Sequence, residues 1–514
     1  MFKLIIIFIY ALVGSKCSKI LGVFPFPSIS HQVVFRPLMH ELANRGHEVT
    51  VITPDPAFPK DKTPQNLTEI DVHDVSYPLW NELLEKKGNE EEPIVFGQIM
   101  SELLLKIVAE QLKSPAVQQL LRENKQFDLI FIESFIRPAL IYSHIYNNAP
   151  VIEFSSWSGY FSTFEKISAA THPIHYPIVL YKRINNLSFW EKLNAFYIYY
   201  SKETMFSQHL HIEDKVMKEI LGPNTTSLKE IEKNVQMFFF NVHTIWDLNR
   251  PVPPNVIYLG GLHQRPTQNE LPKDLKSYLD SSKNGVIYVS FGTNIKPSSF
   301  TPDELKIFTD AFGELPFDVL WKWDNDELPE RPKNVKISKW LPQADLLRHQ
   351  KVKLFITQGG LQSTDEALTA GVPLIGIPML GDQFFNVEQY VKLNIGKGLL
   401  LETISKEKLI DTIQTVIENR SFYQENIIKL RNIMHDQPQS PLQRAVYWTE
   451  YVLRHGGEHL RAPTAHMSLT EYYELELVLT IVAAVLIFLL VSILITCFVI
   501  SKIKSLIPYK VKVN

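Results

Sequence analysis

A pair of glycines between a predicted strand and a predicted helix is the clearest sign of chemistry in this sequence. An apolar run at 352–356 predicts a buried strand, which breaks at Gly359-Gly360 before a short helix that Gly371 ends. Two glycines there let the backbone approach a ligand closely, and the free N–H groups of the helix then point at an anion. This arrangement predicts a phosphate-binding helix start.

Polar side chains follow the glycine pair at positions that suit a sugar phosphate. Gln362, Ser363 and Thr364 fall in the first turn of the predicted helix, where their donors would add to its partial positive charge. Glu366 lies one turn further on and could accept hydrogen bonds from two vicinal hydroxyls. A dinucleotide site would instead need a G-x-G-x-x-G fingerprint after the first strand, which this sequence lacks.

A histidine at the end of the first predicted strand is the candidate base. His31 follows the apolar run at 20–24, and a residue at the carboxyl end of a strand in a Rossmann-like unit faces the cleft. Histidine can take a proton from an acceptor hydroxyl as that hydroxyl attacks an anomeric carbon. The sequence has 16 histidines, and most isolated histidines are structural, so its position distinguishes His31.

Alternating strands and helices must position these residues. The first half of the chain has apolar runs typical of strands at 20–24, 49–52, 129–132 and 151–154, with a helical pattern at 36–44. The second half has a corresponding series at 286–289, 335–337, 354–356 and 374–377. Such alternation predicts an α/β protein with two parallel sheets, each covered by helices on both faces. The proline-rich segment at 250–254 is the expected linker.

Taken in order, these residues resemble the donor-binding signature of the UDP-glycosyltransferase superfamily, in particular its membrane-bound UDP-glucuronosyltransferases and the insect-type UDP-glucosyl/glucuronosyltransferases. The resemblance extends from Lys19 to the C-terminal tail. It implies the GT-B fold, in which two Rossmann-like, doubly wound domains enclose a cleft. It also implies inverting transfer of glucose or glucuronate from a UDP-sugar to a small lipophilic acceptor, as in detoxification.

The resemblance implies a role for each residue of the signature. Trp340 would stack on uracil, and Gln343 would bind the uracil edge or its ribose, whose hydroxyls Glu366 would hold. Asp382 and Gln383 would bind hydroxyls of the transferred sugar. The diphosphate would lie against four residues, namely Thr293, Gly360, Gln362 and Ser363.

Two positions depart from the usual family pattern. Many relatives have histidine where this chain has Gln358, and glutamine donates a neutral hydrogen bond to phosphate but cannot carry a charge. This neutral side chain slightly favours glucose over glucuronate. Relatives place the general base at the histidine that matches His31 and an aspartate after the third strand, where this chain has Glu133. Glutamate is one methylene longer, so pairing it with His31 would need a compensating shift of roughly one ångström.

A possible metal-binding motif lies outside the donor-binding signature. Asp324-Asn325-Asp326 matches the Asp-x-Asp pattern by which many glycosyltransferases hold a metal, but it lies in a polar run without strand context and is expected to form a solvated turn. The helix start at Gly360 could stabilise the departing phosphate instead. We therefore expect metal-independent transfer with no cofactor, the UDP-sugar being a co-substrate.

An aromatic-rich segment at 154–206 leaves two interpretations open. It could form a lipophilic acceptor pocket, or it could serve core packing or contact with a membrane surface. A second function also stays open, because the unusual Glu133 would fit a non-catalytic UDP-sugar-binding or lipophile-binding membrane protein of the same fold.

Both ends of the 514-residue chain are apolar and predict a single-pass type I protein of the endoplasmic reticulum membrane. Lysines follow the C-terminal apolar segment and glutamates precede it, so the catalytic domains are expected in the lumen. The lysines of the last five residues suggest either a retrieval signal or a stop-transfer flank.

The chain is predicted to have six parts. They are a signal peptide at 1–18, an N-terminal acceptor-binding domain at 19–250, a C-terminal UDP-sugar-binding domain at 251–455, a juxtamembrane segment at 456–476, a transmembrane helix at 477–500 and a cytoplasmic tail at 501–514.

Composition excludes some classes of partner. The net charge of −3 and the lack of a basic face argue against nucleic acid. The two cysteines, Cys17 and Cys497, fall in the predicted signal peptide and membrane segment, so the luminal part is expected to fold without disulfides. Homo- or hetero-oligomers remain possible. Luminal topology would permit glycosylation at four sequons, Asn66, Asn186, Asn224 and Asn419.

Overall fold

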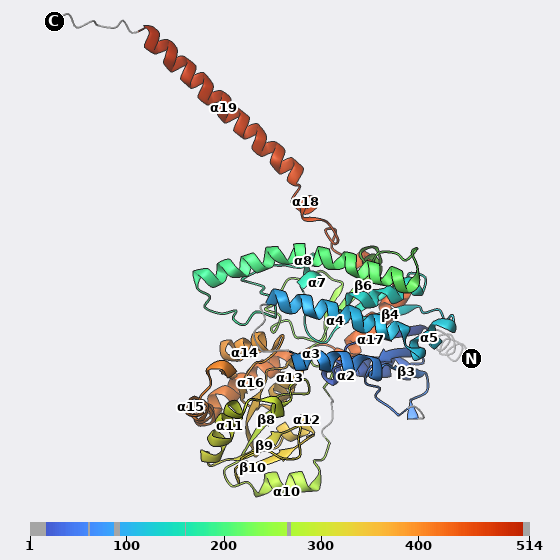
Figure 1. Cartoon of the computed structure of the whole chain (residues 1–514), viewed down its shortest axis with the longest axis vertical. Coiled ribbons are helices and arrows are strands. Elements are labelled where there is room, and N and C mark those ends of the chain that lie inside the picture. Colours follow the sequence, from blue (N-terminus) through green and yellow to red (C-terminus); the bar gives the residue numbers. More distant parts are fainter. Residues whose placement is uncertain (1–16, 60–61, 87–92, 160, 265–268, 507–514) are drawn as a thin grey trace, which may run out of the picture.

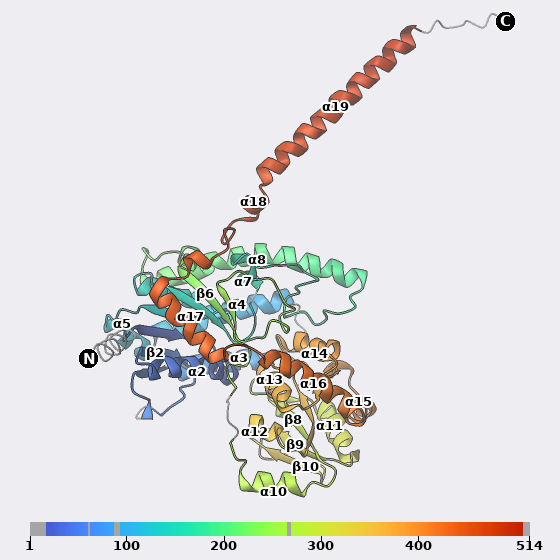
Figure 2. The same cartoon turned by 180° about the vertical axis from the view of Figure 1, so that it is seen from behind.

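The computed structural model describes residues 17–59, 62–86, 93–159, 161–264 and 269–506. Within this part of the chain, two α/β lobes pack together and a long C-terminal helix projects away from the first lobe (Figures 1 and 2). Each lobe is built on one parallel sheet, which confirms the prediction from the alternating strands and helices.

The sheet of the N-terminal lobe has seven strands in the order β3-β2-β1-β4-β5-β6-β7. The strands are β1 (Lys19–Val23), β2 (Glu48–Thr53), β3 (Leu67–Asp71), β4 (Leu129–Glu133), β5 (Val151–Ser155), β6 (Val235–Phe240) and β7 (Val256–Tyr258). Strand β1 pairs with β4, with Val23 opposite Ile132, so their carboxyl ends meet at one edge of the sheet. Every residue of β4 is buried, because helices cover both faces of this parallel sheet.

The sheet of the C-terminal lobe has six strands in the order β10-β9-β8-β11-β12-β13. The strands are β8 (Val286–Ser290), β9 (Asp318–Lys322), β10 (Val335–Ser338), β11 (Val352–Thr357), β12 (Leu374–Gly376) and β13 (Gly396–Gly398). All of its pairings are parallel, and β11 lies between β8 and β12. The loops that leave β8, β9, β10 and β11 therefore all emerge at the same edge.

Helices connect the strands and cover the sheets. In the N-terminal half they are α2 (Ile29–Asn44), α3 (His73–Lys86), α4 (Pro93–Lys113), α5 (Pro115–Arg122), α6 (Ile141–Ile145), α7 (Phe161–Lys166), α8 (Phe189–Leu221) and α9 (Leu228–Ile231). In the C-terminal half they are α10 (Lys273–Ser281), α11 (Pro302–Glu314), α12 (Gln343–Leu347), α13 (Leu361–Ala370), α14 (Gln383–Lys392), α15 (Lys406–Glu418), α16 (Arg420–His435), α17 (Pro441–His455), α18 (Leu469–Tyr472) and α19 (Leu475–Leu506).

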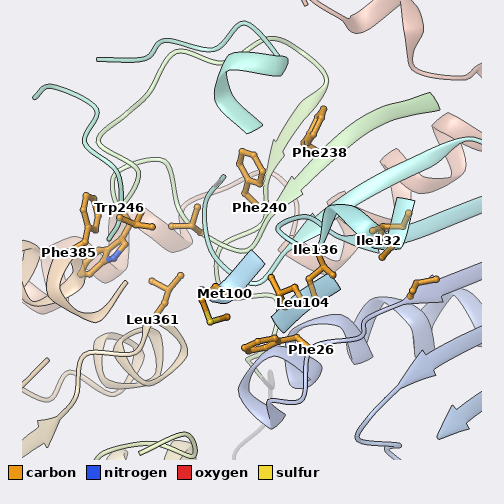
Figure 3. Close-up of a cluster of buried hydrophobic side chains, with 14 of the residues drawn as sticks. Phe26, Met100, Leu104, Ile132, Ile136, Phe238, Phe240, Trp246, Leu361 and Phe385 are labelled. Carbon is orange, nitrogen blue, oxygen red and sulfur yellow. The ribbon is translucent and has the colours of Figure 1, made fainter. Parts of the chain in front are cut away.

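One hydrophobic cluster continues from the first lobe into the second. Figure 3 shows Trp246 of the N-terminal lobe in the same cluster as Leu361 and Phe385 of the C-terminal lobe. The indole N–H of Trp246 donates to Oδ1 of Asn386 at 2.8 Å, so the buried polar atom of this tryptophan is satisfied. Burial of these side chains opposes separation of the lobes, because opening the cleft would expose them to water.

Helix α2 begins seven residues earlier than the pattern at 36–44 predicts. The prediction rested on the helical spacing of Leu38 and Leu42, which gives no signal for the turns that precede them. In the structure Ser28 is the N-cap and Pro37 lies inside the helix. The correction matters because it places His31 in the first turn of α2 rather than in a loop at the end of the first strand.

Two elements cross the boundary predicted between residues 250 and 251. Strand β7 follows the proline-rich segment but pairs with β6, so that segment connects two strands of one sheet. Helix α17 falls in the range predicted for the second domain but packs against α2, and Ala445 and Val446 belong to a core cluster of the N-terminal lobe. The change from one sheet to the other therefore follows Tyr258, and the chain returns to the first lobe at α17.

Helix α19 has the length and composition of a membrane span. It contains 32 residues, none of which is buried, and the helix projects away from the lobes (Figure 1). It is the one helix of the described residues that is long and apolar enough to cross a bilayer. Most of the predicted signal peptide and the lysines of the predicted retrieval signal lie outside the described residues.

Candidate active site

A cavity of about 610 Å³ lies between the two lobes at the carboxyl ends of their strands. Its wall in the N-terminal lobe includes His31, and its wall in the C-terminal lobe includes Trp340, Gly360 and Asp382. This is the position at which open parallel sheets bind ligands. The two groups of residues that the sequence singles out, far apart in the chain, thus face one space.

His31 and Glu133 form a buried pair in this cavity. Glu133 is the last residue of β4, and His31 begins the helix that follows β1, the neighbouring strand. Nδ1 of His31 lies 2.7 Å from Oε1 of Glu133, which is completely buried. Because Nδ1 of His31 donates to the Glu133 carboxylate, the other ring nitrogen, Nε2, is available to a ligand. The predicted contact between these residues is confirmed, and the longer side chain is accommodated without loss of hydrogen-bond distance.

Hydrogen bonds and burial both act on the carboxyl group of Glu133. Burial raises the pKa of Glu133, and the hydrogen bonds from His31 and from the Phe26 N–H, at 3.3 Å, partly oppose that rise. The hydroxyl of Ser156 lies 3.1 Å from the same Nδ1 atom of His31. Ser156 follows β5 directly, and nothing in the sequence reasoning assigned it to the site.

Aromatic rings enclose the imidazole of His31. The ring centroids of Phe26, Phe135 and Trp157 lie 4.7, 5.5 and 5.8 Å from its own. These rings exclude water around the pair and strengthen its electrostatic interaction. The ring plane of His31 is therefore fixed by packing as well as by Glu133.

The glycine pair has the conformation that the sequence predicts. Gly360 is the N-cap of α13, which ends at Gly371 in the left-handed conformation, so the free N–H groups of α13 face the cavity. Gly359 has a φ of +92°, and a Cβ there would lie 2.7 Å from Cγ2 of Val387. Glycine is required at this position for both reasons.

Gln358 packs against a second glycine turn. Gly292, between β8 and Thr293, has a φ of +78°, and a Cβ there would lie 2.2 Å from Nε2 of Gln358. Oε1 of Gln358 accepts from the hydroxyl of Thr357 at 3.1 Å, which directs its amide nitrogen toward Gly292. The turn that carries Thr293 and the start of α13 therefore lie against each other at the cavity wall.

A hydrogen-bonded network connects three residues of the predicted nucleotide site. Nε2 of Gln343 donates to Oγ of Ser363 at 2.9 Å and to Oε2 of Glu366 at 2.8 Å. The hydroxyl of Tyr288 donates to Oε1 of Gln343 at 2.9 Å, which fixes the orientation of the amide. Trp340, three residues before Gln343, is 65% exposed, so one face of its indole is open to a stacking partner.

Asp382 and Gln383 have different surroundings. The carbonyl oxygen of the Gln383 side chain accepts from the N–H groups of Met379 and Leu380, both at 2.9 Å, so this end of the residue supports the loop. Asp382 accepts from Nδ2 of Asn386 at 2.8 Å and lines the cavity. Desolvation raises the pKa of Asp382 to about 6, although the Asn386 hydrogen bond and the charge of His31 across the cavity lower it.

Gln362 lines the cavity, but its side chain forms a hydrogen bond to the other lobe. Its Nε2 donates to the backbone oxygen of Ser156 at 3.1 Å, and its own backbone oxygen accepts from Nε2 of His263 at 3.3 Å. Burial lowers the pKa of His263 to about 4, so this ring is neutral near pH 7. Gln362 and His263 therefore connect the start of α13 to the segment that contacts His31.

Lys322 is a site residue that the sequence reasoning missed. It is the last residue of β9, and its Nζ donates to the backbone oxygen of Gly292 at 2.8 Å and lies 4.7 Å from the ring centroid of Trp340. Desolvation lowers the pKa of Lys322, and the opposing charge is that of Asp324. Among the described residues no carboxylate forms an ion pair with it. The strand that it ends was not among those predicted from the sequence, so no local pattern pointed to it.

The wall on the N-terminal side is largely apolar. It includes Trp80 of α3 and Met100, Ser101 and Leu104 of α4. Of the aromatic side chains that the structure describes in the segment 154–206, Trp157 lines the cavity, whereas Phe189, Trp190, Tyr197 and Tyr200 are exposed. The apolar wall therefore comes mainly from α3 and α4 rather than from that segment.

The Asp-x-Asp segment forms a turn with divided contacts. Asp324 accepts from the backbone N–H of Ser298 at 3.1 Å and from its hydroxyl, whereas Asp326 is exposed and pairs with Lys339 at 2.8 Å. The two carboxylates have separate partners. Over the described residues, no group of three or more histidine, cysteine, aspartate or glutamate side chains is placed to hold a metal ion.

Comparison with known sequences is consistent with this geometry. The sequence pattern of the family described as UDP-glucoronosyl and UDP-glucosyl transferase matches residues 19–507. The chain is 36% identical over 495 residues to the ecdysteroid UDP-glucosyltransferase of Spodoptera littoralis nuclear polyhedrosis virus, covering 93% of this chain and 96% of that protein. It is 30% identical over 523 residues to UDP-glucosyltransferase 2 of Dactylopius coccus, covering 99% and 97%.

Solved structures share the fold at lower identity. The calicheamicin glycosyltransferase CalG4 aligns with a TM-score of 0.56 and 15% identity, covering 85% of this chain and 99% of that one. Arabidopsis thaliana UGT89C1, solved in complex with UDP, aligns with a TM-score of 0.55 and 17% identity, covering 85% and 99%. At these identities the likeness shows the fold, which confirms the prediction of GT-B.

Proposed function

The chain belongs to the UDP-glucuronosyl and UDP-glucosyl transferase family, and we propose that it transfers glucose from UDP-glucose to a hydroxyl of a steroid-like, lipophilic acceptor. As a member of this family it is a UDP-sugar glycosyltransferase of the insect type. The observation that carries the proposal is that one cavity contains the His31–Glu133 pair on one wall and the nucleotide signature on the other.

In the proposed reaction, Nε2 of His31 takes the proton of the acceptor hydroxyl while the hydroxyl oxygen bonds to the anomeric carbon. The bond from that carbon to the diphosphate oxygen breaks, and its electron pair leaves with UDP. Attack opposite the leaving group inverts the anomeric centre and gives a β-glucoside. Glu133, 2.7 Å from Nδ1, would orient the ring and stabilise the imidazolium.

The donor is proposed to lie along the C-terminal wall. Uracil would stack on Trp340, the ribose hydroxyls would bind Glu366 and Gln343, and the free N–H groups at Gly360 would bind the diphosphate. Thr293, Gln358 and Ser363 line the same wall and would complete the diphosphate contacts. Gln362 would contribute through its backbone N–H, because its side chain already donates to Ser156.

Glucose is favoured over glucuronate by two groups at the site. Asp382 would bind sugar hydroxyls, and its carboxylate would repel a carboxylate on the sugar. Gln358 is neutral where a charged side chain could otherwise assist an anionic donor. Relatives that match this chain over most of its length have names that specify glucosyl transfer.

An acceptor screen tests the proposed function most broadly. Trp80, Met100 and Leu104 supply apolar surface for a flat lipophilic ring system, and Ser101 supplies one polar group among them. We expect glucosides to form from an ecdysteroid in microsomes that contain the full chain and UDP-glucose, with UDP-glucuronate at least tenfold less effective. Preference for UDP-glucuronate would contradict the donor assignment, and conjugation restricted to simple phenols would contradict the acceptor class.

Lys322 is proposed to bind the diphosphate through its ammonium group. A half-buried ammonium without an ion-pair partner among the described residues favours an anionic ligand. Lys322→Met should weaken UDP binding roughly 10- to 100-fold, the loss expected for a charge-assisted hydrogen bond, and uridine binding less than threefold. Calorimetric titration would measure both. Lys339→Met, a substitution at an exposed neighbouring lysine, should change neither affinity, and an equal loss for UDP and uridine would show that Lys322 only positions Trp340.

Asp382 predicts a pH dependence for donor binding. Since the pKa of its carboxyl group is raised to about 6, the group is charged above that pH and becomes protonated as the pH falls through it. The KM for UDP-glucose should therefore rise as the pH is lowered from 7 to 5. In Asp382→Asn this rise should vanish, although activity is lower throughout. An unchanged pH dependence in the variant would assign the titration to another group.

Transfer is proposed to proceed without a metal, because the N–H groups at the start of α13 can stabilise the diphosphate. Activity should survive treatment with a chelator and should not depend on added divalent cations. Loss of activity with a chelator and recovery with manganese would contradict this mechanism.

An active transferase is favoured over a non-catalytic binding protein of the same fold. That alternative rested on the longer side chain of Glu133, which reaches His31 at 2.7 Å.

We propose that α19 anchors the enzyme in the endoplasmic reticulum membrane with both lobes in the lumen. The asparagines of all four sequons, Asn66, Asn186, Asn224 and Asn419, are exposed, as luminal glycosylation would require.

A further inference from the structure

Exposed apolar side chains form a stripe along the first half of α8. Trp190, Leu193, Tyr197 and Tyr200 follow one another at spacings of three and four residues, so they lie on one side of the helix, with Phe189 beside them. We refer to these five residues as the aromatic stripe. Each is between 52% and 72% exposed.

The helix itself is held firmly on its other side. Ala195 and Ile198 are buried against Tyr181, and Ser188 forms a capping box with Glu191 at the start of the helix. The aromatic stripe therefore belongs to an ordered helix whose inner face is packed. Within the described part of the chain no residue covers the stripe, and contiguous exposed apolar surface of this kind marks an interaction site.

The connection to α19 places this face of the lobe near a membrane. The segment that leads to α19 is attached to the N-terminal lobe. Arg461 donates to the backbone oxygen of Val235 at 2.6 Å, and the N–H of His466 donates to the backbone oxygen of Lys166 at 3.2 Å. From His466 to the start of α19 at Leu475 the chain can span at most about 30 Å. Figures 1 and 2 both show α8 along the edge of the lobe from which α18 and α19 leave.

We propose that the aromatic stripe lies in the interfacial layer of the bilayer that α19 crosses. The inference rests on the proposed membrane anchoring of α19. Tryptophan and tyrosine combine an apolar ring with a polar tip, which suits the boundary between lipid chains and headgroups. A packed helix with one apolar side fits this layer when it lies parallel to the membrane surface.

This docking would bring the acceptor wall close to the lipid. Helix α8 packs against α4, and α4 supplies Met100, Ser101 and Leu104 to the cavity. A lipophilic acceptor dissolved in the bilayer would then reach the enzyme along a short path, without first dispersing in water. The stripe would serve delivery of the acceptor and would not touch the reacting atoms.

Spin-label accessibility of the full chain in phosphatidylcholine liposomes tests the docking. Cys17 and Cys497 are replaced by serine, and a nitroxide is attached at Trp190→Cys or, as a control, at Phe422→Cys. Phe422 is 51% exposed on α16 of the other lobe. We expect the ratio of oxygen to nickel-chelate collision rates to be at least threefold higher at position 190, and Tyr197→Cys should give the same result if Trp190→Cys disturbs the helix.

Two results would overturn the docking. Equal ratios at positions 190 and 422 would show that the stripe faces water. Low collision rates with both reagents at 190, together with dipolar broadening between labels, would show that a second copy of the chain covers it. Binding of UDP to each labelled variant confirms folding. Because no sugar transfer is measured, failure of the docking is distinguishable from failure of the proposed transferase activity.

Discussion

Replacing His31 with alanine is expected to lower kcat by about 10²- to 10⁴-fold, the range typical of a lost general base. The affinity for UDP should stay close to that of the unchanged enzyme, because the proposed nucleotide contacts come from the C-terminal lobe. Initial rates with UDP-glucose and an ecdysteroid, combined with calorimetric UDP titration, would separate the two effects. Added imidazole should restore part of the lost rate, since it can enter the space vacated by the side chain.

Two further variants make this result specific. His40 lies on the same helix as His31 but outside the cavity lining, so His40→Ala should retain activity. Glu133→Gln keeps the side-chain length but removes the charge that stabilises the imidazolium, so we expect a loss of roughly tenfold or more in kcat with unchanged UDP affinity. Activity of His31→Ala within threefold of the original enzyme would remove His31 from the mechanism.

Substitution of Gly359 by alanine is expected to weaken binding of the UDP-sugar donor by tenfold or more. The added Cβ would lie 2.7 Å from Cγ2 of Val387 and 3.1 Å from the backbone oxygen of Gln383, so the loop must move. That movement shifts Gly360 and the N–H groups of α13 away from the diphosphate. The measurements are the KM for UDP-glucose and the dissociation constant for UDP.

Gly46 provides a matched control for this substitution. Its φ of +94° is almost that of Gly359, +92°, but an added Cβ at Gly46 meets no atom within 4 Å. Gly46→Ala therefore carries the backbone penalty of about 1–2 kcal/mol without the collision. It should lower the melting temperature and leave UDP binding intact. Equal loss of UDP binding in both variants would mean that general destabilisation, rather than the position of α13, explains the effect.

Local patterns predicted most of the elements around the site. The apolar run at 352–356, the glycine pair and Gly371 correspond to β11, the turn and the end of α13 within one or two residues. Each of these features depends on neighbours in the chain, such as a strand that must be buried or a φ that only glycine tolerates. The position of Glu133 beside His31 was also predictable, because β1 and β4 had to be adjacent for the family resemblance to hold.

Contacts between segments that are distant in the chain could not be predicted from local sequence patterns. The apolar side of α17 would suit either sheet, so its return to the first lobe depends on packing that no local pattern specifies. Ser156, His263 and Lys322 lie in ordinary surroundings in the sequence, and their importance arises from the closure of the two lobes around one cavity. The family resemblance assigned the Gln362 side chain to the diphosphate. In the structure this side chain donates to the backbone oxygen of Ser156 in the other lobe, a contact that no local pattern specifies.

A crystal structure of the full chain with UDP and an unreactive acceptor analogue is the most direct test of the account. We predict that the diphosphate lies at the N-terminus of α13 with uracil on Trp340, and that an acceptor oxygen lies within about 3.2 Å of Nε2 of His31. A nucleotide bound elsewhere, or an acceptor whose reacting oxygen is distant from His31 while UDP occupies the cavity, would contradict it.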